Sequence, residues 1–378
     1  MHLFKKKDPG YDRWTLIITV IILCVGLVII SSASVMESTV KYSDPMYQTK
    51  RHLIGIGFAM ICALVCVMIP TAFWKKYSLY FLFLTLVLLI LVLILGRDIN
   101  GAKRWISLGF MNLQPGELLK MFWILYFSDY VSRKIESISD TLLGFVRPVV
   151  FIAIMSGLLL LQPDMGTTIV ITLITYSVMF VAGVGLAKYI VIIVALVGVG
   201  GALVVFSPYR MRRMTSFIDP WADEFDSGYQ LTQSLMAYGR GGWFGEGLGN
   251  SYQKLGYLPE AHTDFVTAIF GEEFGFIGML VLLALEFFLV YKAYVLGFKI
   301  LRQDAIYQGY VAIGIGTWLS LQTFINIGAA SGGLPTKGLT LPFVSYGGSS
   351  LLVFCCAIAI LLRIDYEWRN KIISCNRQ

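Results

Sequence analysis

Charged residues are scarce in this chain: Asp, Glu, Lys and Arg make up 14% of its 378 residues, whereas hydrophobic residues make up 57%. The mean hydropathy is +0.73. Soluble globular domains typically contain about 25% charged residues. This composition therefore excludes an ordinary soluble enzyme and predicts a membrane-embedded protein.

Cysteine is also rare, and no Cys-x-x-Cys spacing occurs among the six cysteines. Five of them lie in long apolar runs and one in the C-terminal tail, where they are interpreted as small apolar side chains. An external disulfide framework is therefore not expected, and we predict no metal site. The cysteines are Cys24, Cys62, Cys66, Cys355, Cys356 and Cys375.

A nucleotide-binding motif is missing as well. The segment GEGLGN at 245–250 is rich in glycine, but no predicted strand precedes it and no Walker lysine follows it. Turns are therefore its expected structure. We expect neither a soluble catalytic domain nor a nucleic-acid partner, so any chemistry must take place at the membrane.

Long apolar runs recur along the whole chain. A helix needs about 20 apolar residues to cross the hydrocarbon core, and lipid permits only helices or closed barrels. The first run is too long for a signal peptide and is expected to be a retained span. We predict an all-α polytopic membrane protein with about ten transmembrane helices, at 15–35, 52–70, 77–96, 117–132, 147–162, 166–184, 186–207, 263–290, 306–330 and 342–363.

Basic residues in the short connections predict the orientation. Lys5, Lys6, Lys7 and Arg13 favour a cytoplasmic N-terminus, and the ten spans then place both termini inside. The opposite face still carries several lysines and arginines. They suggest an anionic substrate or partner, although an ordinary solvated rim is equally open for any one of them.

One connection is far longer than the rest. Residues 208–262 form a predicted extracytoplasmic loop within a single transmembrane domain that spans 1–378. Loops of this length are usually functional or disordered, and the many aromatic residues argue against disorder. The stretch YQLTQSLMAYG sets Leu231, Leu235 and Tyr238 on one face, which predicts a short amphipathic helix within the loop.

Two similar segments, LQPGELLK at 113–120 and LQPDMGTT at 161–168, place a carboxylate just after Gln-Pro at an outer helix end. Glu117 and Asp164 can each serve simply to stabilise a helix N-terminus. Lys120, however, lies one turn after Glu117, and an acid–base pair inside a span normally avoids lipid. We therefore predict that Glu117 and Lys120 form a cavity-facing pair.

The segment LPEAHTDFVTAIFGEEFGFIGML at 258–280 places Asp264 at the start of an apolar run. On a helix, Asp264 heads a stripe of small residues, which would let another backbone or a lipid chain approach closely. It is predicted to act as a general base at the outer end of that groove; a helix N-cap is an equally open interpretation. Glu272 and Glu273 lie off the stripe and are expected to pair with other helices. The small residues are Thr267, Ala268, Gly271, Gly275 and Gly278.

Basic residues lie at the other end of the long loop. The segment PYRMRRMTSF contains Arg210, Arg212 and Arg213, just beyond the seventh predicted span. Arginine is suited to bidentate contacts with phosphate. This segment is therefore a candidate phosphate clamp.

The last predicted external loop, GGLPTKGLTLPFVSYGGSS, contributes Lys337 and Ser345. His262 can orient Asp264, although a purely structural histidine is the more common case. A base, a phosphate clamp and a lipid groove together indicate chemistry on a lipid diphosphate.

Several long motifs resemble the SEDS family, whose name stands for shape, elongation, division and sporulation. They cover nearly the whole chain, and EAHTDF and PTKGLTLPF are more similar to the division member than to the elongation member. One departure is Gly116, where the family pattern has serine. The motifs are NGAKRWI, LQPGELLK, YQLTQSLMAYGRGG, GEGLGNSYQKLGYLPEAHTDF, NIGAASGGLPTKGLTLPFVSYGGSS and LLRIDYE.

The resemblance implies a peptidoglycan glycosyltransferase that polymerises lipid II at the outer face of the bacterial cytoplasmic (inner) membrane, at the division septum. It implies a class B penicillin-binding protein, the septal transpeptidase, and other division proteins as partners. It carries the essential aspartate onto Asp264 and the paired acid and lysine onto Glu117 and Lys120. Asp264 would take the acceptor proton while Arg210 and Arg213 hold the diphosphate. No cofactor is required by the motifs; a divalent cation, Mg²⁺ or Mn²⁺, is left open for the diphosphate charge.

Other functions stay open beside this one. A lipid II flippase should have charged sites near the middle of the membrane, whereas the polar residues here crowd the outer face. A scaffold that only recruits the transpeptidase would not need Asp264 for polymerisation. An elongation-type polymerase is the alternative within the family. The residue pattern favours the division polymerase.

Overall fold

The structure is a computed structural model that describes the chain except for residues 1–9, 100–101, 108, 110–111, 186–187, 191–193, 195–197, 199–200, 203–204, 337 and 371–378. It is mostly helical, because a membrane span must satisfy its backbone hydrogen bonds internally. Its described elements are α1 (Arg13–Ala33), α2 (Val35–Tyr42), α3 (Tyr47–Met68), α4 (Thr71–Leu95), β1 (Arg97–Ile99), β2 (Ala102–Ser107), β3 (Asn112–Leu113), α5 (Pro115–Asp140), α6 (Leu142–Leu161), α7 (Met165–Val181), α9 (Pro208–Ile218), η1 (Pro220–Asp223), α10 (Tyr229–Gly241), η2 (Gln253–Leu255), α11 (Val266–Leu301), α12 (Ile306–Ala330) and α13 (Gly348–Arg369).

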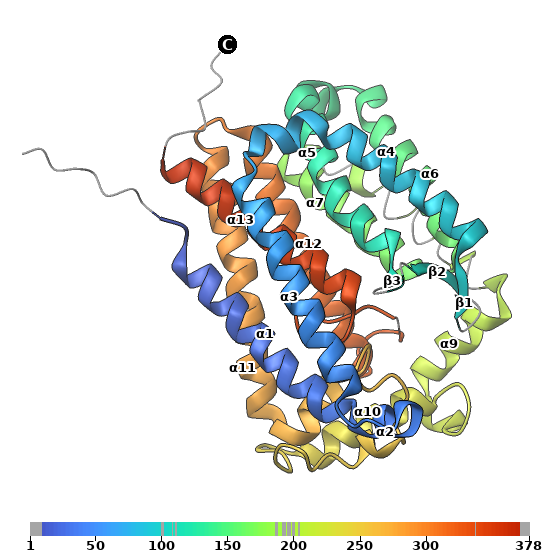
Figure 1. The fold of residues 1–378 in the computed structure, drawn as a ribbon. Helices are drawn as coiled ribbons and strands as arrows, with labels where there is room; N and C mark the ends of the chain where they lie inside the picture. The colour runs from blue at the N-terminus through green and yellow to red at the C-terminus, as the bar shows by residue number, and fades with distance from the viewer. Residues whose placement is uncertain are drawn as a thin grey trace, which may run out of the picture.

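The helices form a bundle whose two ends differ (Figure 1). α1 begins and α13 ends at the same end, where the guanidinium of Arg369 lies 3.6 Å from the carboxylate of Asp12. α2, α9 and α10 gather at the opposite end. Under the orientation predicted from the basic residues, the end with the termini is cytoplasmic and the end with α9 and α10 is extracytoplasmic.

The core lies along α12 and α13, which are the most buried spans, whereas α3 and α4 are among the least buried. α11 packs along α12, and α13 packs along α3. Trp318 of α12 and Phe354 of α13 stack in the centre, with ring centroids 4.5 Å apart. Side chains such as Ile54 and Leu95 are exposed on α3 and α4, as expected of helices that face lipid.

Most of the predicted spans coincide with helices of a multi-pass membrane protein. Seven helices in the described part of the chain are long and apolar enough to cross a membrane, and α7 is a shorter apolar helix. α5 contains the charged Glu117 and Lys120 but occupies the predicted fourth span. The seventh predicted span, 186–207, falls largely outside the described residues, so the count of ten stays a prediction.

The segment before α13 differs from the external loop and early helix start that the sequence predicts. Leu341, Phe343 and Val344 are buried, and α13 begins at Gly348 instead of 342. α1 packs so closely on this segment that a Cβ added at Gly26 would lie 2.6 Å from the carbonyl oxygen of Phe343. Irregular backbone at membrane depth is tolerated where protein covers it. The segment 331–347, apart from residue 337, is therefore a partly buried, non-helical part of the bundle.

A small sheet lies between the predicted spans 77–96 and 117–132. β1 pairs antiparallel with β2, and β2 pairs antiparallel with β3. Arg104 of β2 donates to the carbonyl oxygen of Gln162 at 3.1 Å and to that of Pro163, which ties the sheet to the end of α6. Such short strands do not show the alternating pattern on which strand prediction rests.

α11 is broken at Gly275, whose backbone has φ 68° and ψ −170°. The break leaves carbonyl and N–H groups of α11 without intrahelical partners. The segment 242–247 of the long loop supplies the missing hydrogen-bond partners. The bonds run from Glu246 N–H to Glu272 O (2.9 Å), Gly247 N–H to Glu273 O (3.0 Å), Phe276 N–H to Gly242 O (2.9 Å) and Ile277 N–H to Trp243 O (3.1 Å).

The small-residue stripe of α11 is thus filled by the protein's own loop. A Cβ added at Gly271 would lie 2.6 Å from the ring of Tyr238, and one added at Gly275 would lie 2.4 Å from the backbone nitrogen of Gly245. The prediction that another backbone approaches the stripe is confirmed. The prediction of a continuous helix with a groove for lipid is wrong, because a glycine break recruits α10 and the loop after it.

We expect Gly241→Ala to destabilise the protein by about 1–3 kcal/mol, as overpacking does. Its Cβ would lie 2.1 Å from the carbonyl oxygen of Gly271, so backbone would have to move. Gly239→Ala is the matched control, since it lies in the same helix with nothing within 4 Å of its Cβ and should be neutral or stabilise by about 0.5–1 kcal/mol. Thermal unfolding in detergent measures both; equal melting temperatures would contradict the close packing.

Candidate active site

Asp264 lies in a turn immediately before α11. The N–H groups of Thr263 and Phe265 both donate to the carbonyl oxygen of Glu260, at 3.1 and 3.3 Å, which shapes this turn. The N-cap of α11 is Phe265, and no side chain caps the helix there. The N-cap interpretation of Asp264 is therefore wrong, and its side chain is half-buried beside the start of α11.

The Asp264 carboxylate lies against the segment 331–347. A Cβ added at Gly338 would be 2.9 Å from Oδ2 of Asp264, so glycine allows this close approach. Asn326 of α12 holds both the Asp264 turn and this segment. Its side-chain amide donates to the carbonyl oxygen of Asp264 at 3.0 Å and to that of Leu339 at 2.6 Å. α12 thus sets the position of Asp264 relative to the segment.

Glu117 and Lys120 form a buried ion pair on α5. The ammonium of Lys120 lies 2.7 Å from Oε1 of Glu117 and 2.8 Å from Oε1 of Gln322 on α12. Lys120 is fully buried, and its ammonium lies 5.2 Å from the ring centroid of Trp318. The predicted pairing is present, and it faces α12 instead of lipid. A buried charge is tolerated only with such partners, because desolvation of an unpaired ion costs several kcal/mol.

Gln322 connects this ion pair to the segment beside Asp264. Its amide nitrogen donates to the carbonyl oxygen of Thr340 at 3.0 Å, while its oxygen accepts from Lys120 and from the indole of Trp318. Gln322 and Asn326 lie four residues apart on one face of α12. Asn326 bonds to Leu339 and Gln322 bonds to Thr340, so the two amides hold consecutive residues of the segment 331–347. Residues 338–340 therefore lie between Asp264 on one side and the ion pair of Glu117 and Lys120 on the other.

Gln322 and Asn326 are not among the site residues predicted from the sequence. The signal was available, because QTFIN places two amides four residues apart in an otherwise apolar span. Polar side chains inside a span usually face the interior of the bundle and mark function.

His262 makes a contact different from the predicted one with Asp264. Its Nδ1 lies 3.0 Å from Oε2 of Glu37 on α2, and its carbonyl oxygen accepts from the N–H of Tyr346 at 2.9 Å. The hydrogen bond from His262 lowers the pKa of Glu37 to about 2. His262 therefore holds α2 and the segment 331–347 near the Asp264 turn, which agrees with the structural interpretation.

Ser345 and Asp164 both serve local backbone structure. The hydroxyl of Ser345 is buried and accepts from the N–H of Leu341 at 2.8 Å. Asp164 caps α7, since its Oδ1 accepts from the N–H of Thr167 at 3.1 Å. The N-terminal interpretation of Asp164 is confirmed.

The candidate phosphate clamp is described only in part. α9 carries the three arginines, and Arg212 is exposed. The side chains of Arg210 and Arg213, and the whole of Lys337, lie outside the described part of the structure. Their predicted contacts with phosphate stay predictions.

Glu272 and Glu273 hold the long loop. The carboxylate of Glu272 accepts from the hydroxyl of Ser251 and from the backbone N–H groups of Tyr252 and Gln253, the latter two at 2.9 and 3.2 Å. Its Oε1 also lies 3.8 Å from Nε of Arg240 on α10, so the expectation that Glu272 pairs with a group on another helix is confirmed.

Glu273 makes one of the expected helix contacts. It lies 2.8 Å from the ammonium of Lys254 and accepts from the hydroxyl of Ser32 on α1 at 2.6 Å. Through Lys254 it also ties the loop to α1, so the two glutamates together fix the loop against α11.

Among the described residues, the half-buried carboxylate of Asp264 beside Gly338 is a group that can accept a proton. The ion pair of Glu117 and Lys120 is covered by protein, so it acts on its neighbours and is not open to a substrate in this form. Among the residues that the structure describes, no group of three or more His, Cys, Asp or Glu side chains could hold a metal ion.

Comparisons with known proteins agree along the whole chain. The family model described as "Cell cycle protein", FTSW_RODA_SPOVE, matches residues 13–370. A "Probable peptidoglycan glycosyltransferase FtsW" from Tolumonas auensis is 49% identical, over 96% of this chain and 94% of its own length. A protein of the same name from Coxiella burnetii is 47% identical, over 96% of this chain and 98% of its own length.

Two solved structures have the same fold. One, described as "Structural coordination of polymerization and crosslinking by a peptidoglycan synthase complex", has a TM-score of 0.77 and 26% identity, over 96% of this chain and 99% of that one. The rod shape determining protein RodA of Thermus thermophilus has a TM-score of 0.70 and 25% identity, over 95% of this chain and 98% of that one. This chain therefore belongs to the SEDS family of cell cycle proteins, the family of FtsW and RodA.

Proposed function

We propose that this protein is a peptidoglycan glycosyltransferase that joins lipid II units into glycan strands at the outer face of the bacterial cytoplasmic membrane during cell division. The observation that carries the proposal is the half-buried carboxylate of Asp264, which lies against Gly338 in a segment held by α12. The curated relatives that bear this activity in their name match nearly the whole chain at 45–49% identity.

The reaction needs one base and stabilisation of one leaving group. Asp264 accepts the proton of the acceptor sugar hydroxyl while that oxygen forms a bond to the anomeric carbon of the donor. The bond from that carbon to the diphosphate breaks, and undecaprenyl diphosphate leaves with the electron pair. Arg210 and Arg213 on α9, with Lys337 next to Gly338, balance the charge on the diphosphate. A divalent cation, Mg²⁺ or Mn²⁺, is the alternative source of that charge.

Glu117 and Lys120 act through their neighbours. Because both side chains are buried and Lys120 contacts Gln322, which holds Thr340, we assign the pair to positioning the segment 331–347. Ser345 and His262 support the same segment from its other end. These roles replace direct substrate contacts for the four side chains.

The partner in this proposal is a class B penicillin-binding protein, the septal transpeptidase, together with other division membrane proteins. Support comes from the solved relative that is described as part of a complex coordinating polymerization and crosslinking. The chain acts as one transmembrane domain, 1–378, whose loop 208–262 faces outward at the septum. The aromatic loop supplies external surface for such a partner.

A lipid II flippase is the second candidate, because transporters also use broken helices. Here, however, the freed backbone groups at the Gly275 break are already bonded to the loop segment 242–247. The break is therefore occupied by protein and does not form an open site. This observation favours the polymerase.

We expect Arg213→Ala to lower the polymerisation rate at least about tenfold, which needs only ~1.4 kcal/mol of lost transition-state stabilisation. A hydrogen bond between a charged side chain and phosphate contributes about 1.5–3 kcal/mol, so the loss of one such contact is sufficient. Transbilayer movement of lipid II in reconstituted vesicles should not change. If the substitution stopped lipid movement and left polymerisation of externally supplied lipid II intact, the flippase would replace the polymerase as the conclusion.

A further inference from the structure

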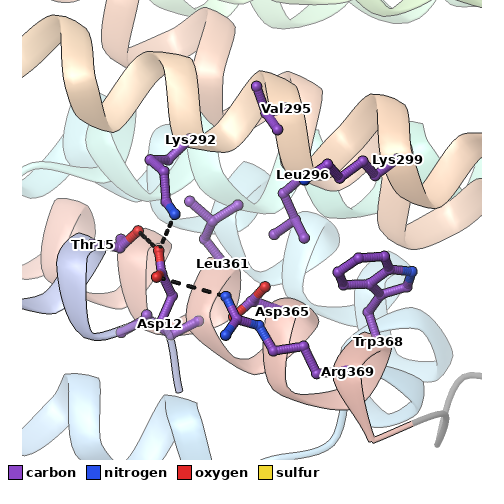
Figure 2. A pocket seen from close by; sticks show the side chains of 11 residues that line it. Asp12, Thr15, Lys292, Val295, Leu296, Lys299, Leu361, Asp365, Trp368 and Arg369 are labelled. Carbon is purple, nitrogen blue, oxygen red and sulfur yellow. Dashed lines mark hydrogen bonds and ion pairs between the residues drawn. The ribbon is translucent and has the colours of Figure 1, made fainter. Parts of the chain in front are cut away.

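A small cavity lies at the end of the bundle opposite Asp264, between α1, α11 and α13. Its volume is about 70 Å³. We call it the inner pocket; its charged and aromatic lining comprises Asp12, Lys292, Lys299, Asp365, Trp368 and Arg369, and Figure 2 shows these side chains on the three helices around it. The catalytic proposal does not use any of them.

The inner pocket carries more cationic than anionic side chains. Asp12 lies 2.7 Å from the ammonium of Lys292, and Asp365 lies 2.8 Å from the guanidinium of Arg369 (Figure 2). The two carboxylates are thus matched by two cations. Lys299 is exposed and has no ion pair among the described residues. The pocket therefore retains one unmatched positive charge and favours an anionic ligand.

Aromatic side chains place the pocket at the depth of lipid head groups. Trp368 lines it, and Trp14, 63% exposed, lies near the start of α1. Tyr11 stacks on Tyr366 with ring centroids 4.8 Å apart. Trp and Tyr collect where the bilayer meets water, so these four rings mark that boundary around the pocket.

Apolar side chains form the remaining wall. Leu296 and Leu361 line the pocket beside the charged groups, and they continue into the apolar spans of α11 and α13. A ligand with an anionic head and an apolar tail would match both parts of this lining.

We propose that the inner pocket binds the phosphate of an anionic phospholipid from the inner leaflet, through the unmatched charge of Lys299, with the ion-paired Lys292 and Arg369 lining the site. Lysine and arginine are the usual partners of phosphate oxygens, and basic pockets between spans on the cytoplasmic side take lipid head groups. The cavity of about 70 Å³ exceeds the roughly 10–15 Å³ that one water molecule needs, so it has room for a larger group such as a phosphate. This site is independent of the proposed transferase reaction.

The test measures binding to the delipidated full-length protein in detergent, with phosphatidylglycerol or inorganic phosphate as the added probe and native mass spectrometry as the readout. Lys299→Gln should raise the Kd for phosphatidylglycerol about threefold to fivefold, the range of an exposed charge contact. Leu296→Phe, which keeps every charge but fills the cavity, should raise it as well. Arg302→Gln is the matched control, because Arg302 is exposed at the same end of α11 but does not line the pocket. Its Kd should equal that of the unmodified protein.

Two results would overturn the proposal. Equal phosphatidylglycerol affinity in all three variants would show that the lipid binds elsewhere. The second result is that inorganic phosphate binds with the same dependence on Lys299 while phosphatidylglycerol does not bind. It would contradict the proposal of a lipid ligand and would show that the pocket binds a soluble phosphate. The melting temperatures of the Lys299→Gln and Arg302→Gln variants should match that of the unmodified protein, because both side chains lie at the surface.

Discussion

Asp264→Asn is expected to abolish glycan chain formation, with a loss of at least about 10²–10⁴-fold, the range that general base catalysis contributes. Asparagine keeps the size of the side chain and the backbone carbonyl that accepts from Asn326 at 3.0 Å. It removes the ability to take the acceptor proton. Expression, melting temperature and copurification with the transpeptidase partner should stay unchanged.

The measurement is polymerisation of purified lipid II by the protein with its cognate transpeptidase, with the glycan products separated on a gel. Asp226→Asn is the control, since Asp226 is an exposed carboxylate of the same long loop. It should polymerise normally. A normal yield of polymer from Asp264→Asn would exclude the base assignment and would favour a scaffold role for the protein.

Glu117→Ala is expected to lower both activity and stability severely. Lys120 is fully buried, and without Glu117 its ammonium keeps only the neutral Gln322 as a hydrogen-bond partner. Removing one member of a buried ion pair typically costs about 3–5 kcal/mol, because the remaining charge is left uncompensated. Gln322 also holds Thr340, so a shift of Lys120 should displace the segment beside Asp264.

The double variant Glu117→Gln with Lys120→Met separates positioning from stability. Neutral side chains of similar volume often restore the stability of a protein that has lost a buried pair. We expect the melting temperature to recover while polymerisation stays at least about tenfold below normal, equivalent to ~1.4 kcal/mol. Recovery of both properties would mean that the pair serves the fold alone.

Local features of the fold were predictable from the sequence. Apolar runs identified the helices because a span must bury its backbone and needs a minimum length. The periodic placement of Leu231 and Leu235 predicted α10 correctly. The pairing of Glu117 with Lys120 followed from a separation of three residues on one helix, which brings side chains together in any helical context.

The break in α11 lay beyond such reasoning. Gly275 permits φ 68°, but glycine is also tolerated inside a regular helix in a membrane. Hydrogen bonds from residues 242–247 stabilise the break. The sequence pattern of α11 does not predict these bonds, because their partners lie in another segment. The same contacts turned the expected lipid groove into a packed interface with the loop.

Composition, and side chains within one helical turn of each other, are enough to predict that the chain spans a membrane many times, that Asp264 lies at the entry of one span, and that Glu117 and Lys120 meet. The contacts between distant residues are visible only in the folded chain: Gln322 joins Lys120, 202 residues away, to Thr340, and Asn326 holds Asp264 and Leu339 together. The physical reason is that a hydrogen bond between distant residues depends on the angle and register at which helices pack. Those quantities come from the fit of all buried side chains at once.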